Sequence, residues 1–148
     1  MRKVKVIKFF ILLVTLIFVS CDSTQFSKTP LNQFEGIWEL KGRDMFKNMQ
    51  IEIRLDEEGK VQSKIVKLND NKYVSLFLEE GDEWVKDIRR TSNYEFVITE
   101  KKIAAPLFSQ YGNSTSKDWN AVFKNENCIG VSESKNAGRS KVEYCRVK

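Results

Sequence analysis

Few side chains in this sequence have the types and spacing that catalysis or metal binding requires. The chain contains no histidine, which excludes Ser–His–Asp triads, histidine metal sites and the commonest general base. It also lacks a glycine-rich phosphate loop and a zinc-type cysteine spacing. Acidic residues gather at 56–58 and 79–83, but both clusters fall in expected turns and neither has the spacing of a calcium loop. We therefore expect no enzymatic activity, no metal site and no cofactor.

Two of the three cysteines have an informative spacing. Cys128 and Cys145 each lie in a short segment expected to be a strand, and residues 135–138 between those segments have a turn composition. If the segments form a hairpin in which Ser134 faces Arg139, the two cysteines lie directly opposite each other, near the reach of a disulfide. A redox-active dithiol is the alternative, but the chain has no Cys-x-x-Cys pair and no histidine to lower a thiol pKa. We therefore predict a structural disulfide.

The first 21 residues are organised like an export signal. A basic head, which includes Arg2 and Lys8, precedes an apolar run at 9–19. This run is shorter than the roughly 20 residues that cross a bilayer comfortably. It leads into Phe18-Val19-Ser20-Cys21, which resembles the cleavage site of bacterial lipoproteins. The resemblance implies that residues 1–20 are a signal helix that is removed, and that Cys21 becomes a lipidated N-terminus attached to a membrane. An ordinary cleaved signal and an uncleaved anchor are the alternatives.

The leader also explains the net charge. The full sequence has 25 basic and 20 acidic residues; removing the four basic residues of the leader leaves 21 against 20, a net charge of +1. A nearly neutral domain gives no basis for nucleic-acid binding. The resemblance to lipoproteins implies an extracytoplasmic domain in the bacterial cell envelope, where disulfides can persist. We expect the outer membrane in preference to the inner one, although Asp22 is an inner-membrane retention signal in some of these bacteria.

Residues 21–33 are predicted to be the lipidated N-terminus and a flexible tether, and residues 34–148 a single domain. The tether is polar and contains Pro30, and the domain consists of short alternating segments separated by turn residues. The expected strands are 34–41, 49–55, 61–68, 73–78, 84–89, 94–98, 119–123, 128–134 and 141–147. A change of apolar parity near Ile65-Val66 indicates a β-bulge in the third of them.

These segments favour an all-β fold. Because the connections are short, neighbouring strands can pair in sequence, and an antiparallel up-and-down β-barrel of about eight or nine strands would remove exposed edges. An open β-sandwich and another kind of small β-barrel are the alternatives. Gly36-Ile37-Trp38 in the first strand resembles the Gly-x-Trp of lipocalin-type, or calycin-like, barrels. That resemblance implies that Arg146, near the end of the chain, packs over Trp38 and closes the barrel base.

Two functions are open for such a barrel. The lipocalin resemblance implies a non-catalytic module that binds a small apolar ligand in its lumen, lined by inward aromatic residues: Trp38, Trp84, Phe96 and Trp119. The alternative is an envelope interaction protein, such as an enzyme inhibitor or an immunity-type protein, which acts through the loops of a filled barrel. A hollow apolar lumen would favour the ligand, and a filled barrel with an exposed aromatic loop would favour the protein partner.

One expected connection is long enough to carry function. It spans residues 100–117 and contains Leu107, Phe108 and Tyr111. Connections of this length are often lids or binding loops. We expect these three side chains to plug one end of the barrel; the alternative is that they gate a cavity or contact a protein partner.

Overall fold

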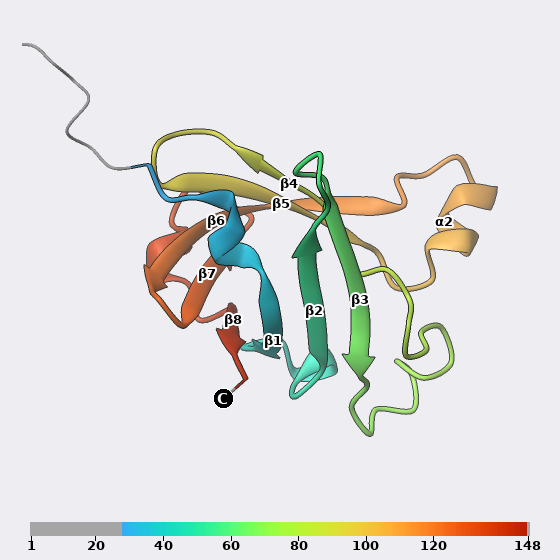
Figure 1. Cartoon of the computed structure of the whole chain (residues 1–148). Helices are drawn as coiled ribbons and strands as arrows, with labels where there is room; N and C mark the ends of the chain where they lie inside the picture. Colours follow the sequence, from blue (N-terminus) through green and yellow to red (C-terminus); the bar gives the residue numbers. More distant parts are fainter. Residues whose placement is uncertain (1–27, 148) are drawn as a thin grey trace, which may run out of the picture.

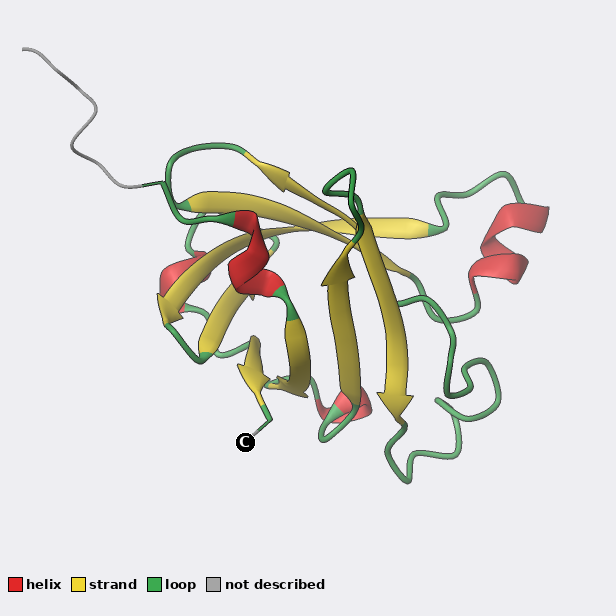
Figure 2. Cartoon of the chain, in the orientation of Figure 1, coloured by secondary structure: helices red, strands yellow, loops and turns green. Residues whose placement is uncertain are grey.

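The computed structural model describes residues 28–147, so the expected leader, Cys21 and the first part of the tether lie outside the described residues. The described chain forms one antiparallel sheet that curls into a nearly closed barrel (Figures 1 and 2). Its strands are β1 (Gly36–Lys41), β2 (Gln50–Leu55), β3 (Val61–Lys67), β4 (Val85–Arg90), β5 (Glu95–Lys101), β6 (Ser116–Asn125), β7 (Cys128–Ser132) and β8 (Glu143–Arg146). The helical segments are η2 (Leu31–Phe34), η3 (Asp44–Phe46), α2 (Ala105–Gln110) and η4 (Ala137–Arg139). Within this part of the chain, none of the helices could span a bilayer.

The strand order confirms the predicted up-and-down topology. It runs β3-β2-β1-β8-β7-β6-β5-β4, so each strand pairs with its neighbour in sequence except across β3 and β4, and β8 closes back onto β1. The seam between β3 and β4 is bridged by the segment that precedes β4. There, the Ile65 amide donates to the Asp82 carbonyl at 2.8 Å and the Gly81 amide donates to the Ile65 carbonyl at 2.8 Å. Backbone groups on this edge of β3 are thereby paired without a regular strand ladder.

The predicted bulge in β3 is confirmed, and one predicted strand is wrong. The register passes from Gln50–Lys67 directly to Ile51–Ile65, which leaves Val66 as the extra residue on β3. Residues 73–78, expected to be a strand, instead form turns in the connection between β3 and β4. Side chains explain the error: the Asn71 carboxamide oxygen accepts the Tyr73 amide at 2.9 Å, one of several local bonds that compete with strand pairing. The described barrel therefore has eight strands.

The interior of the barrel is filled by its own side chains. The core residues come from alternating positions along the strands, because successive strand residues face opposite sides of the sheet. The largest fully buried side chains are Trp38, Trp84, Tyr144, Phe34, Phe96, Leu40, Met49, Ile51, Ile53, Ile65, Ile98 and Ile129. A lumen packed in this way leaves no room for the expected ligand site at its centre.

Trp38 and Arg146 pack together at one end of the barrel, which we call the base. The guanidinium carbon of Arg146 lies 4.3 Å from the centre of the Trp38 ring, and the Trp38 indole donates to the Phe34 carbonyl at 2.7 Å. Gly36 has a φ of +134°, and a Cβ there would lie 2.5 Å from the Arg146 guanidinium. Glycine at this position therefore avoids backbone strain and leaves room for the Arg146 guanidinium to lie across the strand.

Arg146 also ties separate segments together at the base. Its guanidinium donates to the carbonyls of Gln33 at 2.5 Å, Glu35 at 2.7 Å and Glu126 at 3.2 Å. These acceptors lie in or next to η2 and in the turn between β6 and β7. The arginine thus joins both of these segments to β8, and the opposite end of the barrel, which we call the mouth, carries the longer connections.

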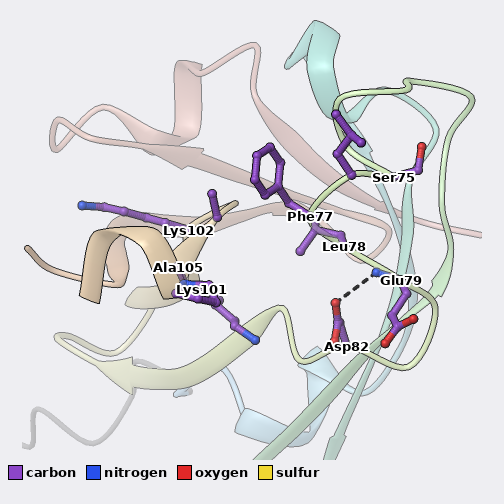
Figure 3. Close-up of a pocket in the computed structure, with 11 residues that line it drawn as sticks. Ser75, Phe77, Leu78, Glu79, Asp82, Lys101, Lys102 and Ala105 are labelled. Carbon is purple, nitrogen blue, oxygen red and sulfur yellow. Dashed lines mark hydrogen bonds between the residues drawn. The ribbon is translucent and has the colours of Figure 1, made fainter. Parts of the chain in front are cut away.

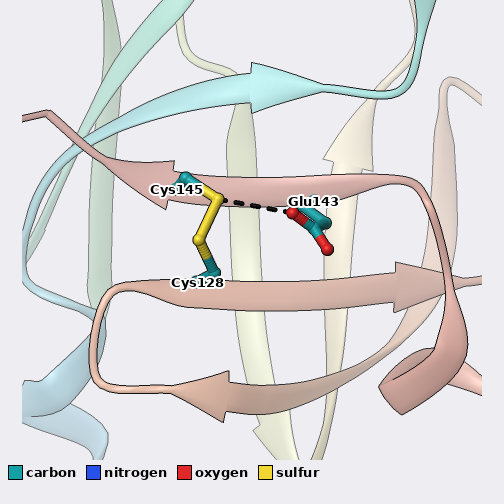
Figure 4. Close-up of side chains that lie close together, drawn as sticks. All are labelled: Cys128, Glu143 and Cys145. Atoms are coloured by element: carbon teal, nitrogen blue, oxygen red, sulfur yellow. Dashed lines mark hydrogen bonds between the residues drawn. A yellow bond between two sulfur atoms is a disulfide. The ribbon is translucent and has the colours of Figure 1, made fainter.

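The predicted disulfide joins β7 and β8. Cys128 lies opposite Cys145 and Ile129 opposite Tyr144, which is the expected register, and the two cysteines are bonded (Figure 4). The Cys128–Cys145 bond encloses the hairpin that contains η4. It therefore fixes the register of β8, the strand that closes the barrel against β1.

Candidate functional site

The mouth is formed by connections that leave the same end of the strands. They are the turn between β1 and β2, residues 68–84 between β3 and β4, residues 102–115 between β5 and β6, and the connection between β7 and β8. Figure 1 shows α2 and the 68–84 connection projecting on the side of the barrel away from η2. In an up-and-down barrel, alternate connections share one end, so the four segments are brought together by topology.

A pocket of about 390 Å³ opens at this end, and we call it the mouth pocket. Its apolar lining consists of Phe46, Trp84, Ile103, Phe108 and Trp119, and its charged lining of Arg43, Glu100, Lys101, Lys102 and Lys117. The volume and the predominance of aromatic walls are typical of pockets for small ligands.

A buried charge network forms the floor of this pocket. Arg43 makes a bidentate pair with Glu100, with Nη1–Oε2 at 2.6 Å and Nη2–Oε1 at 2.8 Å. The Tyr144 hydroxyl donates to the same carboxylate, and the Trp84 indole donates to that hydroxyl at 3.0 Å. Glu100 is only 4% exposed, so its charge requires these partners.

Arg43 and Tyr144 both keep their protons at ordinary pH. Burial by itself would lower the pKa of Arg43, but the charge of Glu100 and the hydrogen bonds more than offset this effect, so the pKa is raised. Burial, followed by the charge of Glu100, raises the pKa of Tyr144 well above 10. Arg43 is thus a permanent cation and Tyr144 a permanent donor.

Aromatic rings surround the Arg43 guanidinium. Its central carbon lies 5.1 Å from the ring centre of Trp119, 5.4 Å from Phe46, 5.8 Å from Tyr144 and 5.9 Å from Trp84. These distances are in the range of cation–π attraction. The rings hold the arginine in place between the core and the mouth pocket.

A second cavity lies beside the mouth pocket (Figure 3). It is a cleft of about 390 Å³ between the 68–84 connection and α2, and Lys101 and Lys102 contribute to both cavities. One wall is braced by a hydrogen bond of 3.0 Å from the Glu79 amide to the Asp82 carboxylate. This cleft lies between two surface connections and its lining is more polar, so the mouth pocket is the better candidate for an apolar ligand.

The structure separates the aromatic residues that the sequence grouped together. Trp84, Phe108 and Trp119 line the mouth pocket, with Trp84 buried, Trp119 partly buried and Phe108 exposed. Phe96 is buried and packs edge-on against Phe34 at 4.9 Å, and Trp38 lies at the base.

The expected plug is also wrong. Leu107, Phe108 and Tyr111 lie on or just after α2, and all three are exposed, Tyr111 at 80%. Six residues of helix place them outside the barrel end rather than inside it. Only Phe108 contributes to the mouth pocket.

Sequence reasoning missed Arg43, Glu100 and Tyr144 as site residues. A signal for Glu100 was present, because Phe96, Ile98 and Glu100 have the same strand parity and the first two are core residues. An acid at an inward position needs a buried cation. No comparable signal marked Arg43, which follows the end of β1.

Cysteine and glutamate side chains also meet on the outer face of the last hairpin (Figure 4). Potential ligand atoms of Cys128, Glu143 and Cys145 lie within 4.8 Å of one another. Both sulfurs are held in the disulfide, so neither is a thiolate that could bind a metal.

The two acidic clusters take part in turns. Asp56 accepts the amides of Glu58 and Lys60 at 3.0 and 2.8 Å, as Asp82 accepts the amide of Glu79.

The mouth pocket is thus the place where apolar surface and buried charge converge. Compared with known proteins, the chain matches no family model, no curated protein and no solved structure.

Proposed function

We propose that this chain is a lipid-anchored protein of the bacterial envelope whose barrel binds a small apolar ligand in the mouth pocket. One observation supports the ligand: a pocket of about 390 Å³ at the mouth of the barrel, with five apolar side chains in its lining. The buried side chains that fill the barrel interior favour the mouth over the lumen as the place for the ligand. The aromatic walls offer dispersion contacts and apolar area to an uncharged body of the size of two fused rings.

A matched pair of substitutions on one segment tests the pocket. Phe108→Ser removes an aromatic wall, whereas Tyr111→Ser removes a more exposed aromatic side chain that does not line the pocket. The neutral fluorophore N-phenyl-1-naphthylamine should bind the full chain and the Tyr111→Ser variant, with weaker binding to Phe108→Ser. Absence of binding, or equal loss in both variants, contradicts the proposed site.

The leader supports the anchor. Its basic head, apolar run and final Ser20-Cys21 resemble a lipoprotein signal. Cells that express the chain should incorporate labelled palmitate into it, and the protein should partition into the detergent phase of Triton X-114. Cys21→Ser should abolish both results. An unlabelled wild-type protein would refute the anchor while leaving the pocket unaffected.

Exposed side chains favour a second candidate, the envelope interaction protein. The exposed side chains around the mouth are Tyr73, Leu76 and Phe77 on the 68–84 connection, Leu107 in α2 and Tyr111 just after it. Apolar side chains gathered on neighbouring loops are typical of contact surfaces. A partner recovered from envelope extract should then be lost by Leu76→Ser with Leu107→Ser and retained by Phe108→Ser; the opposite pattern favours the mouth pocket.

A further inference from the structure

Two buried donors at the mouth pocket have no acceptor among the described residues. They are Nε of Arg43 and Nε1 of Trp119. Both side chains line the pocket, and the Arg43 guanidinium lies 5.1 Å from the centre of the Trp119 ring. Buried N–H groups in folded proteins nearly always have a partner, and those that lack one require an explanation. Both donors thus belong to side chains that line one pocket, where a bound ligand would supply an acceptor.

The positive charge of the pocket lining indicates that the acceptor is negatively charged. The pocket is lined by four basic side chains and one acidic one, Glu100. Glu100 already pairs with Arg43 and Tyr144 inside the floor, so Lys101 and Lys102 at the opening leave an excess of positive charge. Low-dielectric aromatic walls strengthen the field of such charges at a bound group.

We propose that the ligand of the mouth pocket is a small apolar monocarboxylate, whose carboxylate accepts hydrogen bonds from Arg43 Nε and Trp119 Nε1 while its apolar body packs against Phe46 and Phe108. This inference rests on the proposed ligand-binding function and names the ligand class. A carboxylate offers two acceptor oxygens to two N–H donors, and charge-assisted hydrogen bonds are stronger than neutral ones. The neighbouring negative charge of Glu100 disfavours a doubly charged group such as phosphate.

The ligand reaches these donors by displacing side chains at the pocket opening. Both nitrogens are buried beneath neighbouring atoms. Lys117 lies with its ammonium 4.4 Å from the Trp119 ring centre, and its side chain is 39% exposed, as is Phe108. Partly exposed side chains change rotamer rapidly, so an incoming carboxylate can displace Lys117 from the Trp119 ring.

A pair of probes with the same apolar body tests the ligand class. Isothermal titration calorimetry of the full chain compares 1-naphthylacetate with its uncharged amide. The carboxylate should bind about ten-fold more tightly than the amide. Trp119→Phe removes one donor and keeps an aromatic ring, and Arg43→Lys removes Nε–H and keeps a cation beside Glu100. Each variant should reduce the preference for the carboxylate, whereas Tyr94→Phe and Arg89→Lys, at exposed positions outside the pocket, should keep it.

The outcomes separate the inference from the proposed function. If both probes bind equally well, or if neither donor variant reduces the preference, the monocarboxylate assignment is overturned and the apolar site stands. If neither these probes nor N-phenyl-1-naphthylamine binds, the proposed function fails with it. A nitrogen-15 spectrum gives a readout that needs no variant to fold: one indole N–H signal should move downfield with 1-naphthylacetate and not with the amide, and unchanged indole signals overturn the assignment.

Discussion

Three side chains stabilise the buried carboxylate of Glu100, two of them directly and one through Tyr144. Arg43 pairs with both of its oxygens, Tyr144 donates to it, and Trp84 donates to Tyr144. A buried pair of this kind adds little stability compared with an apolar replacement, but losing one partner leaves the other charge exposed to a low dielectric. A single substitution in the network should therefore lower the stability of the protein strongly.

Glu100→Gln should destabilise the protein by about 3 kcal/mol, because Arg43 would remain charged and buried without its counterion. Urea unfolding of the full chain measures this loss. Glu133→Gln is the matched control, since it removes the Lys117–Glu133 pair, in which Glu133 is 67% exposed, and should cost less than about 1 kcal/mol. Similar losses in both variants would show that burial does not determine how much stability is lost when the Arg43–Glu100 pair is broken.

Tyr144→Phe should lower stability by about 1–3 kcal/mol at neutral pH, because Trp84 loses its acceptor and Glu100 a donor. The deficit should then shrink as the pH rises above 10. The pKa of Tyr144 is raised in the folded protein, so unfolded tyrosine releases its proton first and wild-type stability falls by up to about 1.4 kcal/mol per pH unit. Urea unfolding of both proteins from pH 8 to 11 checks the trend, and a constant difference would contradict it.

At the scale of elements, one serine joins β3 to the start of β4 at the seam. The Ser63 hydroxyl donates to the Val85 carbonyl at 2.8 Å and accepts the amides of Val85 at 2.7 Å and Trp84 at 3.2 Å. A single hydroxyl thus replaces several ladder hydrogen bonds where the strands do not pair regularly. It also fixes the backbone of Trp84, which is part of the mouth pocket.

Ser63→Ala should leave three backbone groups at the seam without partners and destabilise the protein by about 1–3 kcal/mol. Amide hydrogen exchange of Trp84 and Val85 should accelerate more than that of β1 and β8. Gln62→Ala, at the exposed position beside it, should change neither measurement. If the amides of Trp84 and Val85 stay protected in Ser63→Ala, other contacts hold the seam.

Local pattern was enough to predict some elements and misled at others. The parity change at Ile65-Val66 predicted the bulge because strand residues alternate strictly between two faces. The hairpin register followed from counting back from its turn, and it placed Cys128 opposite Cys145. Residues 73–78 looked like a strand because alternation cannot detect the side-chain hydrogen bonds, such as that of Asn71, that stabilise turns.

At the scale of the whole molecule, the two ends of the barrel differ in structure. The base is closed by Arg146 over Trp38, and the mouth collects the long connections. The mouth pocket was not predictable from the sequence, because Arg43 and Glu100 are 57 positions apart and meet only when the sheet curls. The Gly-x-Trp resemblance pointed to the base instead, where Trp38 and Arg146 do pack together.

Arg146→Lys should weaken the base without changing the mouth pocket. Lysine keeps the charge but cannot donate to the carbonyls of Gln33, Glu35 and Glu126 at once, so we expect a loss of about 2 kcal/mol in urea unfolding. Arg139→Lys, at an exposed position, should cost less than about 0.5 kcal/mol.

Affinity for 1-naphthylacetate should be the same in Arg146→Lys as in wild type. Its stability loss should also add to that of Trp119→Phe within about 0.5 kcal/mol, because the two sites share no partners and lie at opposite ends of the strands. A larger coupling energy, or weaker binding in Arg146→Lys, would mean that the packed core between Trp38 and Trp84 transmits strain from the base. In that case the two ends of the barrel would act as one unit, and closure of the base would help to set the shape of the pocket.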